Sequence, residues 1–256
     1  MLIDTHSHLH HSSLNKERKG ILTQMCKKNI TFVEVPIDFD SNFVMREKLK
    51  NIPNVRFAAG IHPTRVWKTK GSPELILRHI IRFARRENTV AIGEVGLDYH
   101  IGTEESWSDQ EKWFHHFIEI AQQEDLPMIL HIRQAYEDAI RVLKEHGDHH
   151  RGVVHCFQGD WEVAKQYIDL GLFLGIGGFI TKGCPDLEDT VKKMPLDVMV
   201  LETDCPFITP EPLSGRNSPL NIPLIAQKIA DIKGISVEKV EEVTTQNAIR
   251  LFGLDK

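Results

Sequence analysis

The sequence is poor in the features that mark secreted, membrane-spanning and nucleic-acid-coating proteins. It has four cysteines in 256 residues and no Cys-X-X-Cys pair, so neither a disulfide framework nor a cysteine zinc site is indicated. No apolar run approaches the length of about 18 residues that a membrane helix needs. The first residues lack a basic and a long apolar segment, so no signal peptide is expected. These absences predict a cytoplasmic protein with reduced thiols.

An excess of positive charge is also missing. The chain carries 31 Lys and Arg against 36 Asp and Glu, a net charge of -5. This balance argues against a protein that coats nucleic acid through a global basic field. It leaves open an enzyme that grips one strand end through a metal and a few local cations. No low-complexity tract or Gly/Ser linker divides the chain, so residues 1–256 are expected to form one domain.

Short apolar runs alternate with longer amphipathic segments along the chain. The runs are rich in Val, Ile, Leu or Phe and too short for helices, which is typical of buried parallel strands: 2–3, 30–35, 55–61, 89–93, 127–130, 152–154, 172–176 and 198–201. Helices are predicted over 73–86, 108–124, 135–145, 161–170, 222–233 and 237–251, with Ser72 and Ser236 as capping residues.

Eight strands with helices between them predict a single (β/α)8 TIM barrel, whose usual length of about 250 residues the chain matches. An open doubly wound sheet is the alternative. Catalytic residues of such barrels lie at the C-terminal ends of the strands, which form the mouth.

Side chains that can bind a metal follow almost every apolar run. His6 and His8 are two residues apart, so on an extended strand their imidazoles face the same way. We therefore predict a divalent metal centre at the C-terminal mouth, with these ligands: His6, His8, Glu94, His131, His155 and Asp204. Neutral imidazoles and carboxylates suit Zn²⁺, Mn²⁺ or Mg²⁺ and do not distinguish among them.

Each of these residues also has a purely structural interpretation. A lone His-X-His near an N-terminus is more often solvated than ligating, and a single buried histidine is often just hydrogen-bonded. Glu94 could pair with an arginine, and Asp204 could cap a helix. Buried ionisable groups are costly unless paired or metal-bound, however, and six at one mouth are most simply satisfied by a shared cation. Nothing aims His10 or His11 at the mouth. The remaining histidines are expected in solvent: His79, His115, His116, His146, His149 and His150.

The motifs, in their order, resemble the TatD-type family of metal-dependent deoxyribonucleases within the amidohydrolase-like barrels. The resemblance covers essentially the whole chain and rests on these segments: Ile3–His8, Gly60–Pro63, Gly93–Tyr99, His131–Arg133, His155–Phe157, Leu201–Asp204, Arg216–Pro219 and Thr245–Asn247. It implies the same six ligands, with Glu94 able to bridge two ions. The chain departs from the family at Cys205, where alanine is common, and at Leu213–Gly215, where a more basic run is frequent.

The ligand set predicts a hydrolytic mechanism with two divalent ions, in which Asp204 orients the attacking water and accepts its proton. Glu94 would hold both ions. His62 is expected to contact the substrate or protonate the leaving group, and Arg133 to clamp a phosphate. Arg216 either contacts phosphate or pins its loop. Glu202 either orients a metal ligand or is a structural carboxylate bonded to backbone.

Three functions remain open at this point. The first is cleavage of phosphodiester bonds in DNA, exonucleolytic on single-stranded ends. The second is hydrolysis of amide, lactone or small phosphoester substrates on the same barrel. The third, a barrel without catalysis, is disfavoured by the intact ligand set. A basic, aromatic-lined groove would favour the first, and Arg65, Trp67, Lys68 and Lys70 could begin it. The sequence carries no motif that sets the oligomeric state.

Overall fold

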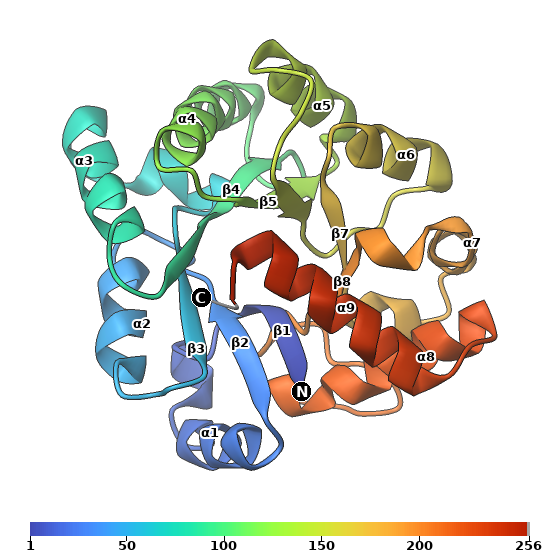
Figure 1. The fold of residues 1–256 in the computed structure, drawn as a ribbon. Coiled ribbons are helices and arrows are strands. Elements are labelled where there is room, and N and C mark those ends of the chain that lie inside the picture. Colours follow the sequence, from blue (N-terminus) through green and yellow to red (C-terminus); the bar gives the residue numbers. More distant parts are fainter. Residues whose placement is uncertain (255–256) are drawn as a thin grey trace.

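A computed structural model describes residues 1–254, which form an eight-stranded parallel barrel surrounded by helices (Figure 1). The strands are β1 Leu2–Ser7, β2 Ile30–Glu34, β3 Val55–Ala59, β4 Thr89–Asp98, β5 Met128–Arg133, β6 Gly152–Val154, β7 Phe173–Ile176 and β8 Met199–Leu201. Each strand pairs in parallel with the next in sequence.

The α-helices pack outside the strands: α1 Arg18–Lys27, α2 Ser41–Leu49, α3 Pro73–Ala84, α4 Glu104–Gln123, α5 Tyr136–Glu145, α6 Trp161–Asp169, α7 Pro185–Lys193, α8 Ile222–Lys233 and α9 Val237–Phe252. Short 3-10 helices are η1 Ser12–Leu14, η2 Pro63–Lys68, η3 Gly178–Thr181, η4 Leu196–Val198 and η5 Pro219–Asn221. Ser72 and Ser236 cap α3 and α9 as predicted, accepting from Leu75 N and Lys239 N. None of the helices within residues 1–254 is long and apolar enough to cross a membrane.

The sheet closes between the first strand and the segment that follows β8. The Asp204 amide donates to the carbonyl of His6 at 2.9 Å, and the His8 amide donates to the carbonyl of Cys205 at 2.8 Å. The predicted barrel is therefore confirmed, and the open doubly wound sheet is excluded. Closure also brings His6 and Asp204, the first and the last predicted ligand along the chain, side by side.

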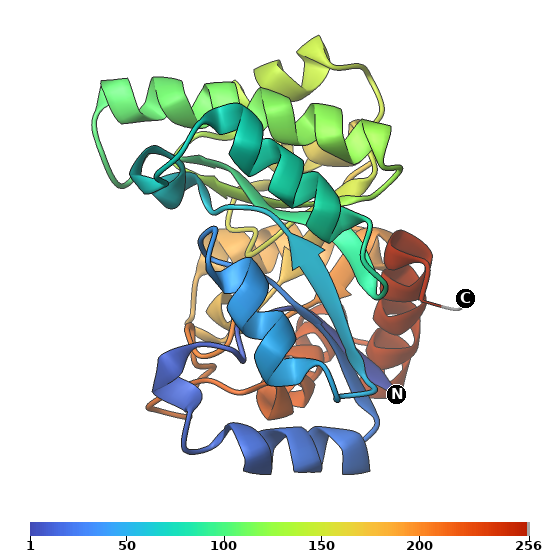
Figure 2. The same cartoon turned by 90° about the vertical axis from the view of Figure 1, so that its left-hand side faces the viewer.

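Small and branched side chains fill the lower part of the barrel. This layer is made by one inward-facing residue from each strand except β7, together with Val35, which directly follows β2: Ile3, Val33, Val35, Ala58, Ala91, Ile129, Val153 and Val200. Ala248, Leu251 and Phe252 of α9 pack against it. In Figure 1, α9 lies across the near end of the barrel, beside the start of β1. The loops that follow the strands gather at the opposite end (Figure 2), and buried polar residues such as His6 and Glu94 lie toward it.

Local irregularities in two strands decide which side chains reach this polar end. Ile3 faces the barrel interior, so strict alternation would point His6 outward. In β1, however, Asp4 pairs with Phe32 and Ser7 with Glu34, three steps against two. The extra residue is a β-bulge that reverses the alternation and turns His6 inward.

Strand β4 contains a similar irregularity. Ala91 faces inward, and Gly93 and Val95 pair with consecutive residues of β5, Ile129 and Leu130. The extra residue of β4 at this point is Glu94. The irregularity places the Glu94 carboxylate inside the barrel mouth, three residues after an inward-facing alanine.

Candidate metal centre

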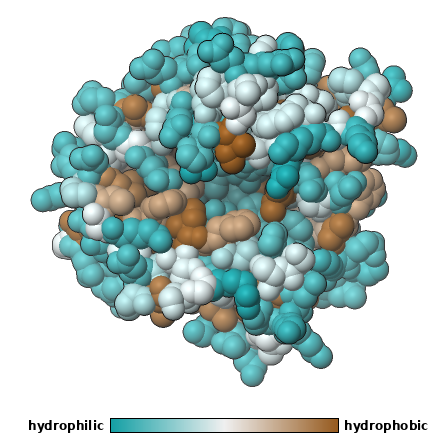
Figure 3. Space-filling view, turned by 180° about the vertical axis from the view of Figure 1, so that it is seen from behind, coloured by the Kyte–Doolittle hydropathy of each residue, from teal (hydrophilic) through white to brown (hydrophobic). Residues whose placement is uncertain are grey.

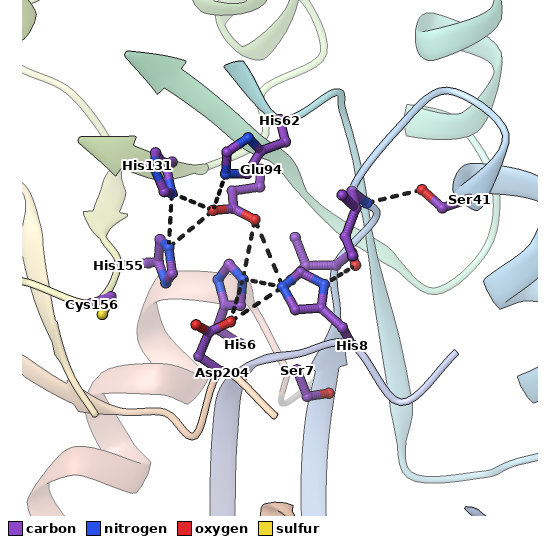
Figure 4. A network of polar contacts seen from close by, with 12 residues as sticks. His6, Ser7, His8, Ser41, His62, Glu94, His131, His155, Cys156 and Asp204 are labelled. Carbon is purple, nitrogen blue, oxygen red and sulfur yellow. Dashed lines mark hydrogen bonds and ion pairs between the residues drawn. The ribbon is translucent and has the colours of Figure 1, made fainter. Parts of the chain in front are cut away.

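The six predicted ligands converge around the carboxylate of Glu94, which lies between two groups of side chains (Figure 4). Its Oε2 is 3.4 Å from His6 Nε2 and 3.8 Å from His8 Nε2. Its Oε1 is 2.7 Å from His131 Nδ1 and 3.0 Å from His155 Nε2. Each carboxylate oxygen therefore faces its own pair of imidazoles.

Asp204 completes the first group. Its Oδ1 lies 3.3 Å from His8 Nε2 and 3.9 Å from His6 Nε2. Ligand atoms that share a tetrahedral ion with bonds of about 2.1 Å lie about 3.4 Å apart. The spacings in both groups, from 2.7 to 3.9 Å, lie around this value, and His131 Nδ1 and His155 Nε2 are 3.4 Å apart.

The outer ring nitrogens of three histidines are held by acceptors. His8 Nδ1 donates to the carbonyl of Val35 at 2.7 Å, and His131 Nε2 to Asp98 Oδ2 at 2.9 Å. His155 Nδ1 lies 3.3 Å from Glu202 Oε1. In the neutral imidazole each of these bonds leaves the inward nitrogen with a free lone pair, the form that binds a metal.

Within the cluster, carboxylates and imidazoles act as one another's counter-charges, and they shift one another's pKa values. Burial raises the pKa of Glu94, but electrostatic interactions with the surrounding histidines outweigh it and hold that pKa well below its usual range. Burial likewise lowers the pKa of His8, but its hydrogen bond to Asp204 prevails and raises the pKa to about 9.

These observations match a divalent cation better than the structural interpretations. Glu94 is buried among histidines and forms no ion pair with an arginine in residues 1–254. The buried Nδ1 of His6 and Oε2 of Glu202 have no hydrogen-bond partner in the described chain. Asp204 caps no helix; its side chain faces His8 instead. The donor set of imidazole nitrogens and carboxylate oxygens suits the predicted ions.

His62 lies beside the second group of donors, and a hydrogen bond fixes which of its ring nitrogens carries the proton. Its Nδ1 accepts from the amide of Thr64 at 3.1 Å, so the proton of the neutral ring resides on Nε2. Nε2 lies 3.6 Å from Glu94 Oε1. Burial, helped by the charge of His131, lowers the pKa of His62 to about 3. His62 therefore presents an N–H donor to the mouth.

Glu202 combines the two roles that the sequence left open. Its carboxylate is fully buried, and Oε1 accepts from the backbone amide of Cys156 at 2.6 Å while facing His155 Nδ1. It is thus both bonded to backbone and placed to orient His155.

The two predicted arginines are in different surroundings. The Arg133 side chain is exposed at the end of β5, lines the cavity beside His131, and forms no ion pair within residues 1–254. Arg216 forms an ion pair with Glu17, which holds its loop against the segment before α1. The loop-pinning interpretation of Arg216 thus has a partner in the structure.

Sequence reasoning missed two buried carboxylates that support the ligands. Glu34 accepts from Ser7 Oγ, the amide of Leu9, and the amide and Nδ1 of His10, so it fixes the turn that carries His8. A charged residue inside the run 30–35 was the available signal. Asp98, the second, lies within the quoted segment Gly93–Tyr99 and holds His131.

One expectation about the other histidines is wrong. His150, expected in solvent, is 7 % exposed, and its Nε2 bonds to the carbonyl of Leu143 at 2.9 Å. It lies between the end of α5 and β6, and its Nε2 is bonded to backbone carbonyls, those of Leu143 and Gly147, so its role is structural.

Replacing Asp98 with alanine is expected to weaken metal affinity about 10–100-fold, because the His131 ring loses the acceptor that fixes its tautomer and orientation. Metal titration followed by calorimetry measures this change. Asp109→Ala is the matched control, because this partly exposed aspartate on α4 contacts Lys112 and no histidine of the cluster. Equal affinities in the two variants would show that Asp98 does not orient His131.

The mouth opens into a cavity of about 290 Å³ on the side of β5 to β8. Its lining combines ligands with apolar and polar neighbours: His131, Ile132, Arg133, His155, Cys156, Gln158, Phe179, Asp204 and Ile208. Figure 3 shows this face hollowed near its middle, with hydrophobic residues on part of the rim. A small ligand group can therefore reach the six-residue cluster from solvent.

Comparisons with known proteins agree on one family. Residues 3–253 match the model of the TatD related DNase family. The chain is 34% identical to the uncharacterized metal-dependent hydrolase YabD of Bacillus subtilis, over all of both chains. It is 32% identical to the human deoxyribonuclease TATDN3, covering 98% of this chain and 94% of that one. The crystal structure of the TatD homologue YJJV from Escherichia coli superposes with a TM-score of 0.88 at 25% identity, covering 98% of each chain.

Proposed function

Because the chain belongs to the TatD family of metal-dependent hydrolases, we propose that this single-domain hydrolase cleaves phosphodiester bonds of DNA, acting on single-stranded ends. The proposal rests on the position of Glu94, whose two carboxylate oxygens face two separate groups of donor atoms. One carboxylate with imidazoles on both oxygens suits two neighbouring cations, the arrangement that phosphodiester hydrolysis uses. A relative named deoxyribonuclease supports the choice of DNA.

We assign two divalent ions, Mg²⁺, Mn²⁺ or Zn²⁺, to the two groups of donors. His6, His8 and Asp204 would hold one, and His131 and His155 the other, with Glu94 contributing one oxygen to each. When bound, such ions polarise a phosphoryl oxygen and lower the pKa of water toward about 7.

The chain's own residues do the remaining work. Asp204 accepts the proton of the attacking water; burial raises its pKa, but His8 outweighs this effect, so the carboxylate is ionised at neutral pH. His62, neutral at pH 7, donates a hydrogen bond from Nε2–H to a substrate oxygen or to the oxygen of the leaving group and keeps its proton. Glu202 keeps His155 in place through Nδ1. Arg133 clamps a phosphate in the adjoining cavity, and we assign no substrate contact to Arg216.

The free thiols of all four cysteines support a cytoplasmic location.

The proposed chemistry is tested with metal-reconstituted protein on end-labelled single-stranded DNA, beside a panel of amides, lactones and small phosphoesters. Cleavage that chelation abolishes and that Mg²⁺ or Mn²⁺ restores supports the proposal. Turnover of an amide or lactone without cleavage of DNA would replace it.

For Arg133→Ala we expect a higher KM for single-stranded DNA and a melting temperature close to that of the unmodified protein. The exposed guanidinium forms no ion pair or side-chain hydrogen bond in residues 1–254 and acts on Asp98 only through its charge, so its removal costs substrate contact and little stability. The slope of log affinity against log salt should fall by about 0.7, the value for one phosphate contact on a single strand. An unchanged slope with a clear loss of stability would assign Arg133 a structural role.

A further inference from the structure

A second cavity lies on the other side of the metal-ligand cluster, between the loop after β2 and the 3-10 helix η2. It has a volume of about 420 Å³, and we call it the η2 cleft after its lining residues: Asp38, Phe39, Asp40, Arg65, Lys68, Thr69 and Lys70. Both segments follow strands, so the cleft belongs to the same face as the mouth. The cavity that holds Arg133 is lined by the segments after β5 to β8, so the two lie on opposite sides of the centre.

One wall of the η2 cleft is cationic and unneutralised. The side chains of Arg65, Lys68 and Lys70 are exposed, and none forms an ion pair or a side-chain hydrogen bond with another residue of the described chain. Some exposed cations elsewhere are paired, as Arg141 is with Glu111, and others such as Lys27 are not; the cleft differs in gathering three unpaired cations around one cavity. Three unpaired cations around one cavity favour an anion with several charged oxygens.

The opposite wall has a different chemistry. The half-buried ring of Phe39 contacts Phe43 edge to face, with centroids 5.9 Å apart. Beside it Asp40 is exposed, and although it precedes α2 its side chain caps no amide. An aromatic face stacks on bases, and a carboxylate accepts from base amino groups. The cleft thus has cations that can bind a phosphate. It also has an aromatic ring and a carboxylate that can bind a base.

The aromatic partner differs from the one expected from sequence. Trp67 is partly buried and packs against the hydrophobic core, and it does not line the cleft. Phe39, from the neighbouring loop, lines the cleft instead.

The cleft is connected to the centre through His62. This residue immediately precedes η2, and its amide donates to the carbonyl of Ile37, at the start of the other wall, at 3.0 Å. Six residues of 3-10 helix extend about 12 Å. That length corresponds to three or four stacked nucleotides at about 3.4 Å each.

We propose that the η2 cleft is a second nucleotide-binding subsite, which holds a part of a single-stranded DNA substrate a few nucleotides from the bond that is cleaved. Phosphates contact Arg65, Lys68 and Lys70, and a base lies on Phe39. The inference rests on the proposed function, and it adds that substrate length matters: a strand long enough to reach the cleft is preferred over a small diester.

The test compares Lys68→Gln/Lys70→Gln with Lys27→Gln/Lys28→Gln in metal-loaded protein. The control removes the same charge from exposed residues at the end of α1, away from the mouth. The substrates are a single-stranded 12-nucleotide DNA and bis(p-nitrophenyl) phosphate. For the cleft variant we expect the ratio of kcat/KM between the two substrates to fall roughly tenfold, as two partly exposed ion pairs predict. The salt slope for binding the strand should fall by about 1.4, or 0.7 for each contact.

A separate variant tests the aromatic wall. Phe39→Leu keeps apolar volume but removes the ring, so affinity for the strand should fall about fivefold or more while the salt slope is retained. Melting temperatures monitor the fold of every variant.

The outcomes separate the two proposals. If the unmodified protein cleaves the strand and the cleft variant matches the α1 control in ratio and slope, the subsite is wrong and the nuclease function stands. If the unmodified protein hydrolyses the small diester but neither binds nor cleaves the strand, the nuclease function fails and the subsite fails with it.

Discussion

Glu94→Ala is expected to reduce hydrolysis by about three orders of magnitude while the barrel remains folded. Glu94 is the one residue whose two oxygens face both groups of donors, so its loss removes a ligand from each. The contribution of bound cations to transition-state stabilisation is several kcal/mol, and each 1.36 kcal/mol corresponds to about tenfold in rate. Folding is spared because the neighbours of Glu94 are polar side chains of the mouth and not the apolar core.

The measurement combines steady-state kinetics, metal content and thermal unfolding. Glu87→Ala, in the exposed turn before β4, is the matched control and should behave as the unmodified protein. The variant should also bind less metal per chain. Full activity in Glu94→Ala at unchanged metal content would rule out the assignment of this carboxylate to the centre.

Asp204→Asn is expected to lower kcat about 10²–10⁴-fold with a much smaller effect on KM. The amide keeps the shape of the carboxylate, and its oxygen can still face His8, but it cannot accept a proton from water. Because the ionised form of Asp204 is favoured by His8, the carboxylate is available as a base across the neutral range. The variant therefore loses the chemical step and retains substrate contacts.

Single-turnover kinetics on a single-stranded substrate isolate that step from product release. A substitution at the nearby Asn217 is unsuitable as a control, because its side chain donates a hydrogen bond to the carbonyl of Thr203 and so supports the loop. Asp231→Asn, exposed on α8, removes a similar charge far from the mouth and is the control. A loss confined to KM in Asp204→Asn would make this residue a binding group and assign the base elsewhere.

The sequence by itself determined the barrel and predicted which side chains gather at its mouth. Eight short apolar runs with helices between them leave few alternatives, because parallel strands need crossover helices and a chain of this length closes the sheet. These candidate ligands could be named from the sequence because ionisable residues such as His131 and His155 end apolar runs, where burial is costly without a partner. The tertiary structure added that these residues meet around one carboxylate.

Only the tertiary structure decided which way the ligands face and what supports them. Spacing placed His6 and His8 on one side of a strand, but the bulge in β1 chose the inward side, and the irregularity at Glu94 did the same in β4. A bulge depends on pairing with a neighbouring strand, which local spacing does not record. The partners Glu34, Asp98 and Val35 were hidden for the same reason. Each holds its histidine across a strand boundary, and such contacts exist only after the barrel has closed.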